Sequence, residues 1–405
     1  MPREYAEKRE SMSQAQGALR LASIDAYRGL VMFLMMAEVL RLCDVAKDLP
    51  GQRVWELLCH HQSHVEWTGC SLHDLIQPSF SFLVGVALPF SLVNRLAKSQ
   101  SKAWLTSHAL WRSLVLVLLG VFLRSSNQGQ TNFTFEDTLS QIGLGYTFLF
   151  VLALFSPRVQ WFALGILLAG YWAAFAFYPA PPGDFDFAKV DVPSGWAHHS
   201  VGFAAHWDKN SNLAWAFDTW FLNLFPRKKP FLSNSGGYAT LSFIPTLGTM
   251  ILGLLAGGVL MRSCDAWAKL RWLCAWGIGL LLAGWGLGEL GICPVVKRIW
   301  TPSWVLYSGG FCFLFLAGFY AVLDVLGARS WAFPLRVIGM NSIAAYCMSG
   351  LFEDFVKHSL NTHFGERIFA ILGPPYIPLL HGTAVLLALW AILFWMYRCK
   401  AFLRI

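Results

Sequence analysis

Long apolar runs, repeated along nearly the whole chain, constrain its fold more than any other feature of the sequence. A helix needs about 20 apolar residues to cross a bilayer. Only 13% of the 405 residues are charged, about half the share that is usual in soluble domains. The sequence therefore predicts an all-α, polytopic membrane helix bundle of about ten transmembrane helices. The predicted spans are 26–43, 72–94, 109–124, 138–156, 159–178, 241–262, 272–293, 303–325, 336–356 and 379–397.

Lysine and arginine are divided unequally between the two sets of loops that these spans create. With the N-terminus placed inside, roughly 18 of the 31 lysines and arginines fall in the shorter, cytoplasmic segments, as the positive-inside rule requires. Both termini are then expected to be cytoplasmic. The predicted parts are an N-terminal segment (1–25), a membrane domain (26–398) and a tail (399–405). The net charge of +8 follows from this topology, so we expect no nucleic-acid partner.

The predicted extracytoplasmic loop at about 179–240 is longer and more aromatic than a simple connector needs to be. It contains Trp196, Trp207, Trp215 and Trp220. Two interpretations stay open. The loop forms an interfacial aromatic belt with short amphipathic helices, such as Asn212 to Phe225. Alternatively it is a lid over a site, because tryptophan faces suit sugar rings.

Two glycine patterns are best explained by close helix packing. Gly286, Gly288 and Gly291 match a dinucleotide-binding fingerprint, but they lie inside an apolar span and follow no predicted strand. Gly253 and Gly257 form a GxxxG pair, a spacing that lets two membrane helices approach closely. Neither pattern predicts a nucleotide site.

Cysteine and histidine spacing gives little support for a structural metal. The nine cysteines are scattered without a CxxC pair, which argues against a disulfide framework and against a zinc site. A single bridge between Cys59 and Cys70 stays open, because both fall in a loop expected to face an oxidising compartment. His60, His61 and His64 offer three nitrogens, but no fourth ligand follows from the spacing, so we expect no metal.

Ionisable residues in or beside apolar spans are costly to keep there and are therefore candidates for function. They are densest around the first two spans. Asp25 and Arg28 open the first span, and Glu38 follows Arg28 by about 15 Å along the helix. We expect Glu38 either to pair with Arg41, one turn away, or to belong to a site.

His64, just before the second span, is the strongest candidate for chemistry. A neutral imidazole can take a proton from an attacking hydroxyl or amine and return one to a leaving group. The alternative is an exposed loop histidine. Asp74 falls in the first turn of the second span, where a carboxylate interacts favourably with the positive end of the helix dipole. Its functional alternatives are to fix the tautomer of His64 or to stabilise an ammonium substrate.

Several segments together resemble a known family. The stretch His64-Val-Glu-Trp67-Thr-Gly69-Cys-Ser-Leu-His-Asp74, continuing through Gln77 and Pro78, resembles the second-span signature of heparan-alpha-glucosaminide N-acetyltransferase and its bacterial relatives. Four further segments are similar to that family in the same order: 21–29, 244–257, 300–309 and 338–342.

The resemblance implies a membrane acetyltransferase of ten or eleven helices that takes acetyl-CoA from the cytoplasm and acetylates an amino sugar on the far side. It places the active-site histidine on His64 and the following carboxylate on Asp74. Asn341 falls on a late-span asparagine, and Arg28 on the phosphate side. The implied location is the bacterial inner (cytoplasmic) membrane. Whether the acetyl group passes through an acetyl-histidine or directly to the acceptor stays open.

Charge and hydrogen-bonding capacity extend the candidate site. The polyanionic CoA should dock where cytoplasmic arginines gather, and a thioester carbonyl needs donors for its developing negative charge. We assign to acetyl-CoA the residues Asp25, Arg28, Gln77, Arg112 and Asn341, with Arg20, Arg95 and Arg336 nearby. To the acceptor we assign Glu38, Glu66, Trp67 and His61.

Two other functions stay open. A transporter or carrier with a polar site at the midplane would show inverted halves and broken helices, and no repeat is evident between residues 1–200 and 200–405. An O-acyltransferase acting on envelope glycans would keep the same fold and site. Glycine pairs and aromatic spans are compatible with a homodimer.

Overall fold

The computed structural model describes residues 21–97, 100–126 and 128–403. Arg20 and most of the predicted N-terminal segment lie outside this range. Within it, regular structure is helical apart from one isolated antiparallel bridge between Thr68 and Val296. The prediction of an all-α fold is confirmed for this part of the chain.

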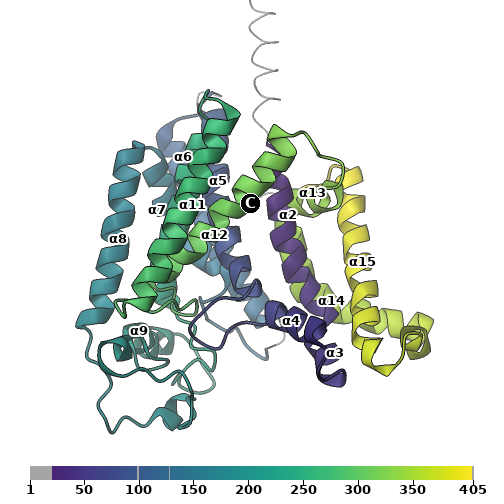
Figure 1. The fold of residues 1–405 in the computed structure, drawn as a ribbon, viewed down its shortest axis with the longest axis horizontal. Coiled ribbons are helices and arrows are strands. Elements are labelled where there is room, and N and C mark those ends of the chain that lie inside the picture. Colours follow the sequence, from purple (N-terminus) through teal and green to yellow (C-terminus); the bar gives the residue numbers. More distant parts are fainter. Residues whose placement is uncertain (1–20, 98–99, 127, 404–405) are drawn as a thin grey trace, which may run out of the picture.

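Helices occupy each of the ten predicted spans (Figure 1). Seven of them are long and apolar enough to cross a membrane, so the chain is a multi-pass membrane protein. These seven are α5 (Ile76–Leu96, preceded by the short turn η2, His73–Leu75), α6 (Lys102–Ser125), α8 (Pro157–Phe177), α10 (Phe243–Leu260), α11 (Ala266–Glu289), α12 (Pro302–Tyr320, continued by the π-helical turn η7, Ala321–Val325) and α15 (Ile377–Arg398).

The other three predicted spans are shorter or bent. The first contains α2 (Ala22–Met36), whose 15 residues give about 22 Å of helix, less than the roughly 30 Å of a bilayer core. It continues as the 3-10 turn η1 (Ala37–Leu40) until Arg41, with φ at 49°, interrupts the helix. The fourth contains α7 (Thr138–Ala153), which has 16 residues. The count of ten crossings therefore stays a prediction.

The ninth predicted span is a broken helix. It consists of α13 (Phe333–Met340) and α14 (Ser342–Phe364), which meet at Asn341 with a bend of 81°. The Asn341 side chain donates to the carbonyl of Ala401 and accepts from the amide of Leu403, each at 3.1 Å. At this break, Asn341 binds the C-terminal segment of the chain. A transported substrate is therefore not needed to explain the asparagine at the broken helix.

Helix α10 forms the centre of the bundle. Its apolar segment is 83% buried, against 22% for α8 and for α11, which lie at the periphery. A Cβ atom on Gly253 would lie 1.9 Å from the Phe82 carbonyl oxygen, and one on Gly257 would lie 2.4 Å from that of Val86. Here α10 and α5 pack backbone to backbone, so the predicted GxxxG groove is confirmed.

The packing explanation fails for one glycine of the Gly286–Gly288–Gly291 pattern. A Cβ atom added to Gly286 would have no heavy atom within 4 Å, so close packing does not explain this residue. One added to Gly288 would lie 3.0 Å from Val295 Cγ2, and Gly291 has a φ of +68° at the end of the helix.

The two described ends of the chain lie at the same end of the bundle (Figure 1). The hairpin of α3 (Leu42–Asp48) and α4 (Arg53–Gln62) lies at the opposite end, as does α9 (Leu213–Phe221) in the long loop. This arrangement is consistent with termini that share one side of the membrane. That this side is the cytoplasm stays a prediction.

The loop at 179–240 is folded around an apolar core that it shares with α8, the segment after His64 and the α11–α12 loop. Trp196 and Trp207 are buried in it beside Trp67 and Phe175, so the interpretation of these two loop tryptophans as an interfacial belt is wrong. Trp220, 61% exposed, does fit an aromatic belt. The predicted amphipathic helix is present as α9. The other short turns are η3 (Phe187–Val190), η4 (Gly202–Trp207), η5 (Leu222–Leu224), η6 (Thr240–Ser242), η8 (Glu366–Ala370) and η9 (Pro374–Tyr376).

Candidate functional site

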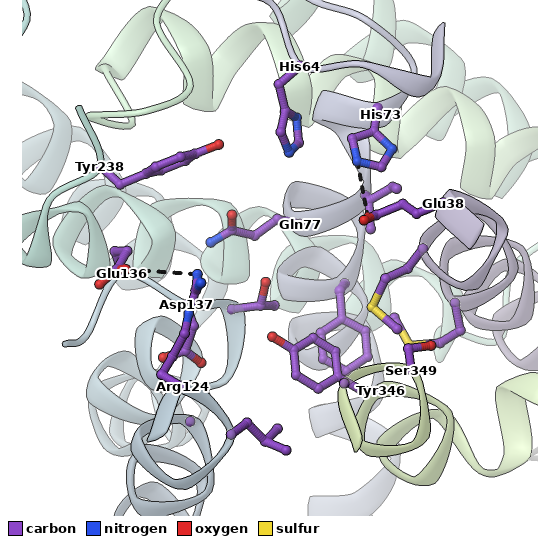
Figure 2. Close-up of a pocket in the computed structure, with 18 of the residues that line it drawn as sticks. Glu38, His64, His73, Gln77, Arg124, Glu136, Asp137, Tyr238, Tyr346 and Ser349 are labelled. Carbon is purple, nitrogen blue, oxygen red and sulfur yellow. Dashed lines mark ion pairs between the residues drawn. The ribbon is translucent and has the colours of Figure 1, made fainter. Parts of the chain in front are cut away.

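A cavity of about 590 Å³ lies within the bundle, and the long loop contributes Tyr238 to its lining (Figure 2). Residues from α2, η1, α5, α6, α7, α14 and four connecting segments line it. Four of the predicted site residues meet at or beside this cavity: His64, Gln77 and Glu38 line it, and Asp74 lies behind His64. The remaining lining residues are Met32, Met35, His73, Ile76, Phe80, Gly120, Leu123, Arg124, Glu136, Asp137, Thr138, Tyr238, Lys297, Tyr346, Ser349, Gly350 and Glu353.

The imidazole of His64 is directed toward the cavity (Figure 2). Its Nδ1 lies 2.8 Å from Asp74 Oδ1, and its side chain is 36% exposed. A carboxylate can only accept, so Nδ1 carries the hydrogen in this pair and Nε2 is left with a lone pair. His64 is therefore held at one nitrogen and free to exchange a proton at the other, unlike an unconstrained loop histidine.

Asp74 is buried and fully engaged. Its Oδ2 accepts from the amides of Val65 at 3.1 Å and Ser71 at 3.0 Å, while Oδ1 faces His64. The carboxylate thus holds the loop before α5 in shape and also orients the imidazole. The helix-terminal and tautomer-fixing roles considered for Asp74 are compatible in this geometry.

Lys297 is the main residue that sequence reasoning missed. It reaches the site from the loop between α11 and α12, where Val296 pairs with Thr68. Its buried Nζ lies 3.2 Å from Asp74 Oδ1 and 3.0 Å from His64 Nδ1. Because Nδ1 uses its hydrogen to donate to Asp74, the Lys297 ammonium donates to Asp74 Oδ1 and not to the ring. The sequence did contain one indication of its role. Lys297 follows Val295 and Val296 at the end of an apolar span, where a cation is costly.

The surroundings of His64 act on its pKa in opposite directions. Burial lowers the pKa of His64, the hydrogen bond and charge of Asp74 raise it, and the Lys297 ammonium lowers it again. The net effect is a pKa below the usual value. The imidazole is therefore neutral near pH 7, the form that a general base requires. Burial also lowers the pKa of Lys297, while Asp74 opposes that shift.

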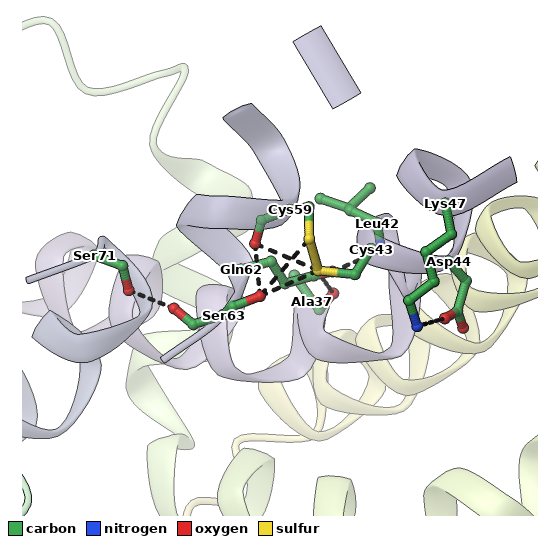
Figure 3. The surroundings of a disulfide bond; sticks show 9 residues. All are labelled: Ala37, Leu42, Cys43, Asp44, Lys47, Cys59, Gln62, Ser63 and Ser71. Atoms are coloured by element: carbon green, nitrogen blue, oxygen red, sulfur yellow. Dashed lines mark hydrogen bonds and ion pairs between the residues drawn. A yellow bond between two sulfur atoms is a disulfide. The ribbon is translucent and has the colours of Figure 1, made fainter. Parts of the chain in front are cut away.

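A disulfide holds the hairpin from which His64 emerges (Figure 3). It joins Cys43 of α3 to Cys59 of α4, whereas Cys70 is free, so the considered Cys59–Cys70 bridge is wrong. The Ser63 hydroxyl donates to the Cys59 carbonyl at 2.8 Å, and the Ser71 hydroxyl lies 2.5 Å from the Ser63 carbonyl. A short chain of bonds thus connects the disulfide to the loop around His64.

Of the two alternatives for Glu38, the structure agrees with a place in the site and not with a pair to Arg41. Its carboxylate lies 3.2 Å from Nε2 of His73, whereas Arg41 lies beside Asp44 at 4.0 Å, so the predicted Glu38–Arg41 pair is wrong. Arg41, with φ at 49°, ends the 3-10 turn that contains Glu38 and precedes α3, the helix that carries Asp44. The His73 ring is 4.4 Å from that of His64, so Glu38 and His73 extend the site.

The other residues assigned to the acceptor lie outside the cavity lining. Trp67 is buried against Trp196 in the core of the long loop. Glu66 accepts a hydrogen bond from the Trp196 indole. His61 accepts one from the Leu72 amide at 3.3 Å. These three positions shape the loops around His64 instead of contacting the cavity.

Most residues assigned to acetyl-CoA also lie outside the cavity lining. Asp25 and Arg28 form a pair at 3.9 Å in the first two turns of α2. Arg112 packs on Tyr146, 4.6 Å from the ring centroid, and donates to its hydroxyl. Asn341 binds the C-terminal segment, as described above. Helix α2 runs from Arg28 to the cavity-lining Met35, seven residues or about 10 Å further along.

The histidines of the HHxxH pattern do not gather around a common point. In the part of the chain that the structure describes, no group of three or more histidines, cysteines or carboxylates has the arrangement of a metal site. His60 and His61 contact one another, with ring centroids 5.1 Å apart.

Fold and site together define a class: a multi-pass helical membrane protein with a polar cavity, in which a carboxylate and a lysine flank one histidine. The chain is similar to heparan-alpha-glucosaminide N-acetyltransferase from Homo sapiens, with 25% identity over 382 residues, or 83% of this chain and 53% of the human protein. The protein of that name from Mus musculus is 24% identical over 390 residues, or 85% of this chain and 55% of its own length.

These similarities make the chain a distant relative of heparan-alpha-glucosaminide N-acetyltransferase. The chain spans about half the length of the curated relatives that it matches. No family model matches it.

Proposed function

We propose that the protein is a membrane acetyltransferase that moves an acetyl group from acetyl-CoA to the amine of a glucosamine-type sugar. The observation that carries this proposal is the geometry of His64, which bonds Asp74 through Nδ1 and presents its other nitrogen to a cavity. The distant relationship to an N-acetyltransferase supports the same reaction class. The proposed location is a bacterial cytoplasmic membrane with the cavity on the outer side.

His64 acts as a general base in the proposed reaction. The amine nitrogen attacks the thioester carbonyl carbon, and Nε2 of His64 takes the proton that the amine loses. The carbon–sulfur bond then breaks, and the imidazolium returns the proton to the leaving thiolate. The products are an N-acetylated sugar and the CoA thiol. Asp74 stabilises the transient imidazolium through the bond at Nδ1.

Two further side chains serve this step. The Lys297 ammonium beside Asp74 keeps His64 neutral before reaction, because it opposes protonation of the imidazole. The Gln77 side chain lines the cavity and offers an N–H donor to the carbonyl oxygen as negative charge develops on it. Both roles depend on a cavity that excludes bulk water.

The donor is proposed to enter along α2. CoA phosphates would bind near Arg28 at the far end of this helix, and the pantetheine arm would follow it to Met32 and Met35 at the cavity. The thioester would then meet the acceptor beside His64. Arg112 packs on Tyr146 and Asn341 binds the C-terminal segment, so the proposal gives neither residue a role in donor binding.

Substitution of His64 tests the proposal. With purified protein, acetyl-CoA and glucosamine, we expect His64→Gln to lower the rate of product formation by about 100-fold or more, the usual contribution of a general base. His60→Ala is the matched control, because His60 is an exposed histidine of the same hairpin. Mass spectrometry of the products provides the measurement.

The outcomes separate the alternatives. Full activity of His64→Gln would overturn the role of His64. An acetylated hydroxyl in place of an acetylated amine would make the protein an O-acyltransferase. Acetyl transfer to His64 itself, seen by peptide mass spectrometry with acetyl-CoA alone, would indicate a covalent route.

A further inference from the structure

The wall of the cavity opposite His64 has its own polar group, formed by Arg124, Glu136 and Asp137 and called here the distal wall (Figure 2). It is built where α6 ends and α7 begins. Asp137 is the N-cap of α7, and its Oδ1 accepts from the amides of Leu139 and Ser140, each at 3.0 Å. The proposed reaction assigns no task to these residues.

Asp137 has hydrogen-bonding capacity that the protein does not use. The residue is only 5% exposed, and its buried Oδ2 has no hydrogen-bond partner among the described residues. A Cβ atom on Gly120 of α6 would lie 2.7 Å from this oxygen, so only glycine leaves room for the carboxylate. The hydroxyl of Ser349, which also lines the cavity, is likewise buried and unpartnered among these residues. Buried polar atoms are normally satisfied, so these two atoms indicate a polar ligand.

The charges around the cavity restrict what that ligand is. Arg124 lies 3.8 Å from Glu136 and reduces the charge of the distal wall. Burial raises the pKa of both Glu136 and Asp137. Four carboxylate residues line the cavity against one arginine and one lysine, and such a balance disfavours an anion and suits a cation bearing hydroxyl groups.

We propose that the distal wall is an acceptor subsite that binds the ring hydroxyls of an amino sugar, while the amine of that sugar reaches His64. Asp137 Oδ2 accepts a hydrogen bond from one hydroxyl, and the Glu136–Arg124 pair accepts from and donates to its neighbours. The subsite makes the enzyme specific for polyhydroxylated amines over alkyl amines of similar size. This inference rests on the proposed function for its reaction, but not for its binding step.

Asp137→Asn is the sharpest variant, because asparagine is also a good N-cap and converts only the acceptor at Oδ2 into a donor. We expect it to raise KM for glucosamine by about tenfold or more, as for loss of one hydrogen bond to a charged group. The KM for cyclohexylamine and the KM for acetyl-CoA should stay unchanged. Glu136→Gln should act in the same direction, and Asp184→Asn, in an exposed loop position, is the control.

Direct binding separates this inference from the proposed function. Isothermal titration calorimetry of the full chain with glucosamine, without acetyl-CoA, should give a dissociation constant about tenfold weaker for Asp137→Asn than for the unmodified protein. This comparison holds even if no acetylated product forms, which would overturn the proposed function alone. Equal glucosamine affinity in the two proteins, or an equal loss of activity toward glucosamine and cyclohexylamine, would overturn the subsite.

Discussion

The imidazole of His64 lies between side chains of opposite charge. Asp74 and Lys297 both contact Nδ1, and His73, itself paired with Glu38, lies against the ring. Asp74 favours the protonated ring, whereas Lys297 and His73 disfavour it. The working pH range of a base in this position is therefore set by its neighbours, and each neighbour can be tested.

Two substitutions should move the pH dependence of the reaction in opposite directions. His64 works as the neutral base, so the rate falls as pH decreases through its pKa. Lys297→Met removes a positive charge, which should raise the pKa of His64 and shift the acidic limb of kcat/KM upward by about one pH unit. Asp74→Asn removes a negative charge and should shift the limb downward.

The measurement is kcat/KM for acetyl-CoA against pH, with the same acceptor throughout, so that ionisation of the amine is common to all variants. His60→Ala should leave the limb in place. Shifts of the same sign in the Lys297 and Asp74 variants would contradict the assignment of His64 as the titrating base.

Local patterns in the sequence were sufficient for part of this site. His64, Asp74 and Gln77 fall in one stretch of 14 residues, so their proximity follows from short-range structure. Lys297 lies 233 residues away from His64 and joins the site only through the packing of two loops, which no local pattern predicts. Arg112 and Asn341 show the reverse case, since their chemistry suited a site but the fold leaves them outside the cavity lining.

At the level of elements, the contact between α5 and α10 positions the cavity. Helix α5 carries Gln77 and Phe80 at its cavity end, and its middle packs on α10 without intervening side chains. The apolar runs predicted both helices, and the GxxxG pair predicted a packing groove on α10 but not that α5 fills it. They did not predict the shortening of α2 or the break at Asn341, because both depend on backbone geometry at single residues.

A pair of glycine substitutions within α10 tests that contact. Gly253→Ala would place its Cβ 1.9 Å from the Phe82 carbonyl oxygen, whereas Gly258→Ala would meet no heavy atom within 4 Å. We expect Gly253→Ala to destabilise the protein by about 1–3 kcal/mol, the usual cost of overpacking. Thermal unfolding in detergent measures the difference, and equal transition temperatures for the two variants would show that the helices are further apart.

At the level of the whole molecule, the open question is which face of the bundle meets the cytoplasm. The disulfide Cys43–Cys59 lies in the α3–α4 hairpin, at the end of the bundle that also carries the long loop. Disulfides persist in oxidising compartments, so this bridge supports the same orientation as the distribution of lysine and arginine. The disulfide in the structure and the charge distribution in the sequence thus favour the same orientation.

Natural cysteines allow the orientation to be measured. Cys264 and Cys399 are free and exposed, and both are expected on the cytoplasmic side. A membrane-impermeant maleimide should label them in inside-out vesicles and leave them unlabelled in sealed right-side-out vesicles. Ser233→Cys, in the long loop, should show the opposite pattern. The reverse labelling at all three positions would show that the termini lie outside the cell and that the predicted orientation is wrong.

The disulfide beside His64 also has a consequence for biogenesis. A newly inserted chain already carries every residue of the site, but its hairpin still has two thiols and lacks the link that restrains the segment before His64. The protein would then become active only after two steps, insertion into the membrane and formation of the disulfide. A chain whose hairpin stays in a reducing compartment would keep both thiols and would remain inactive.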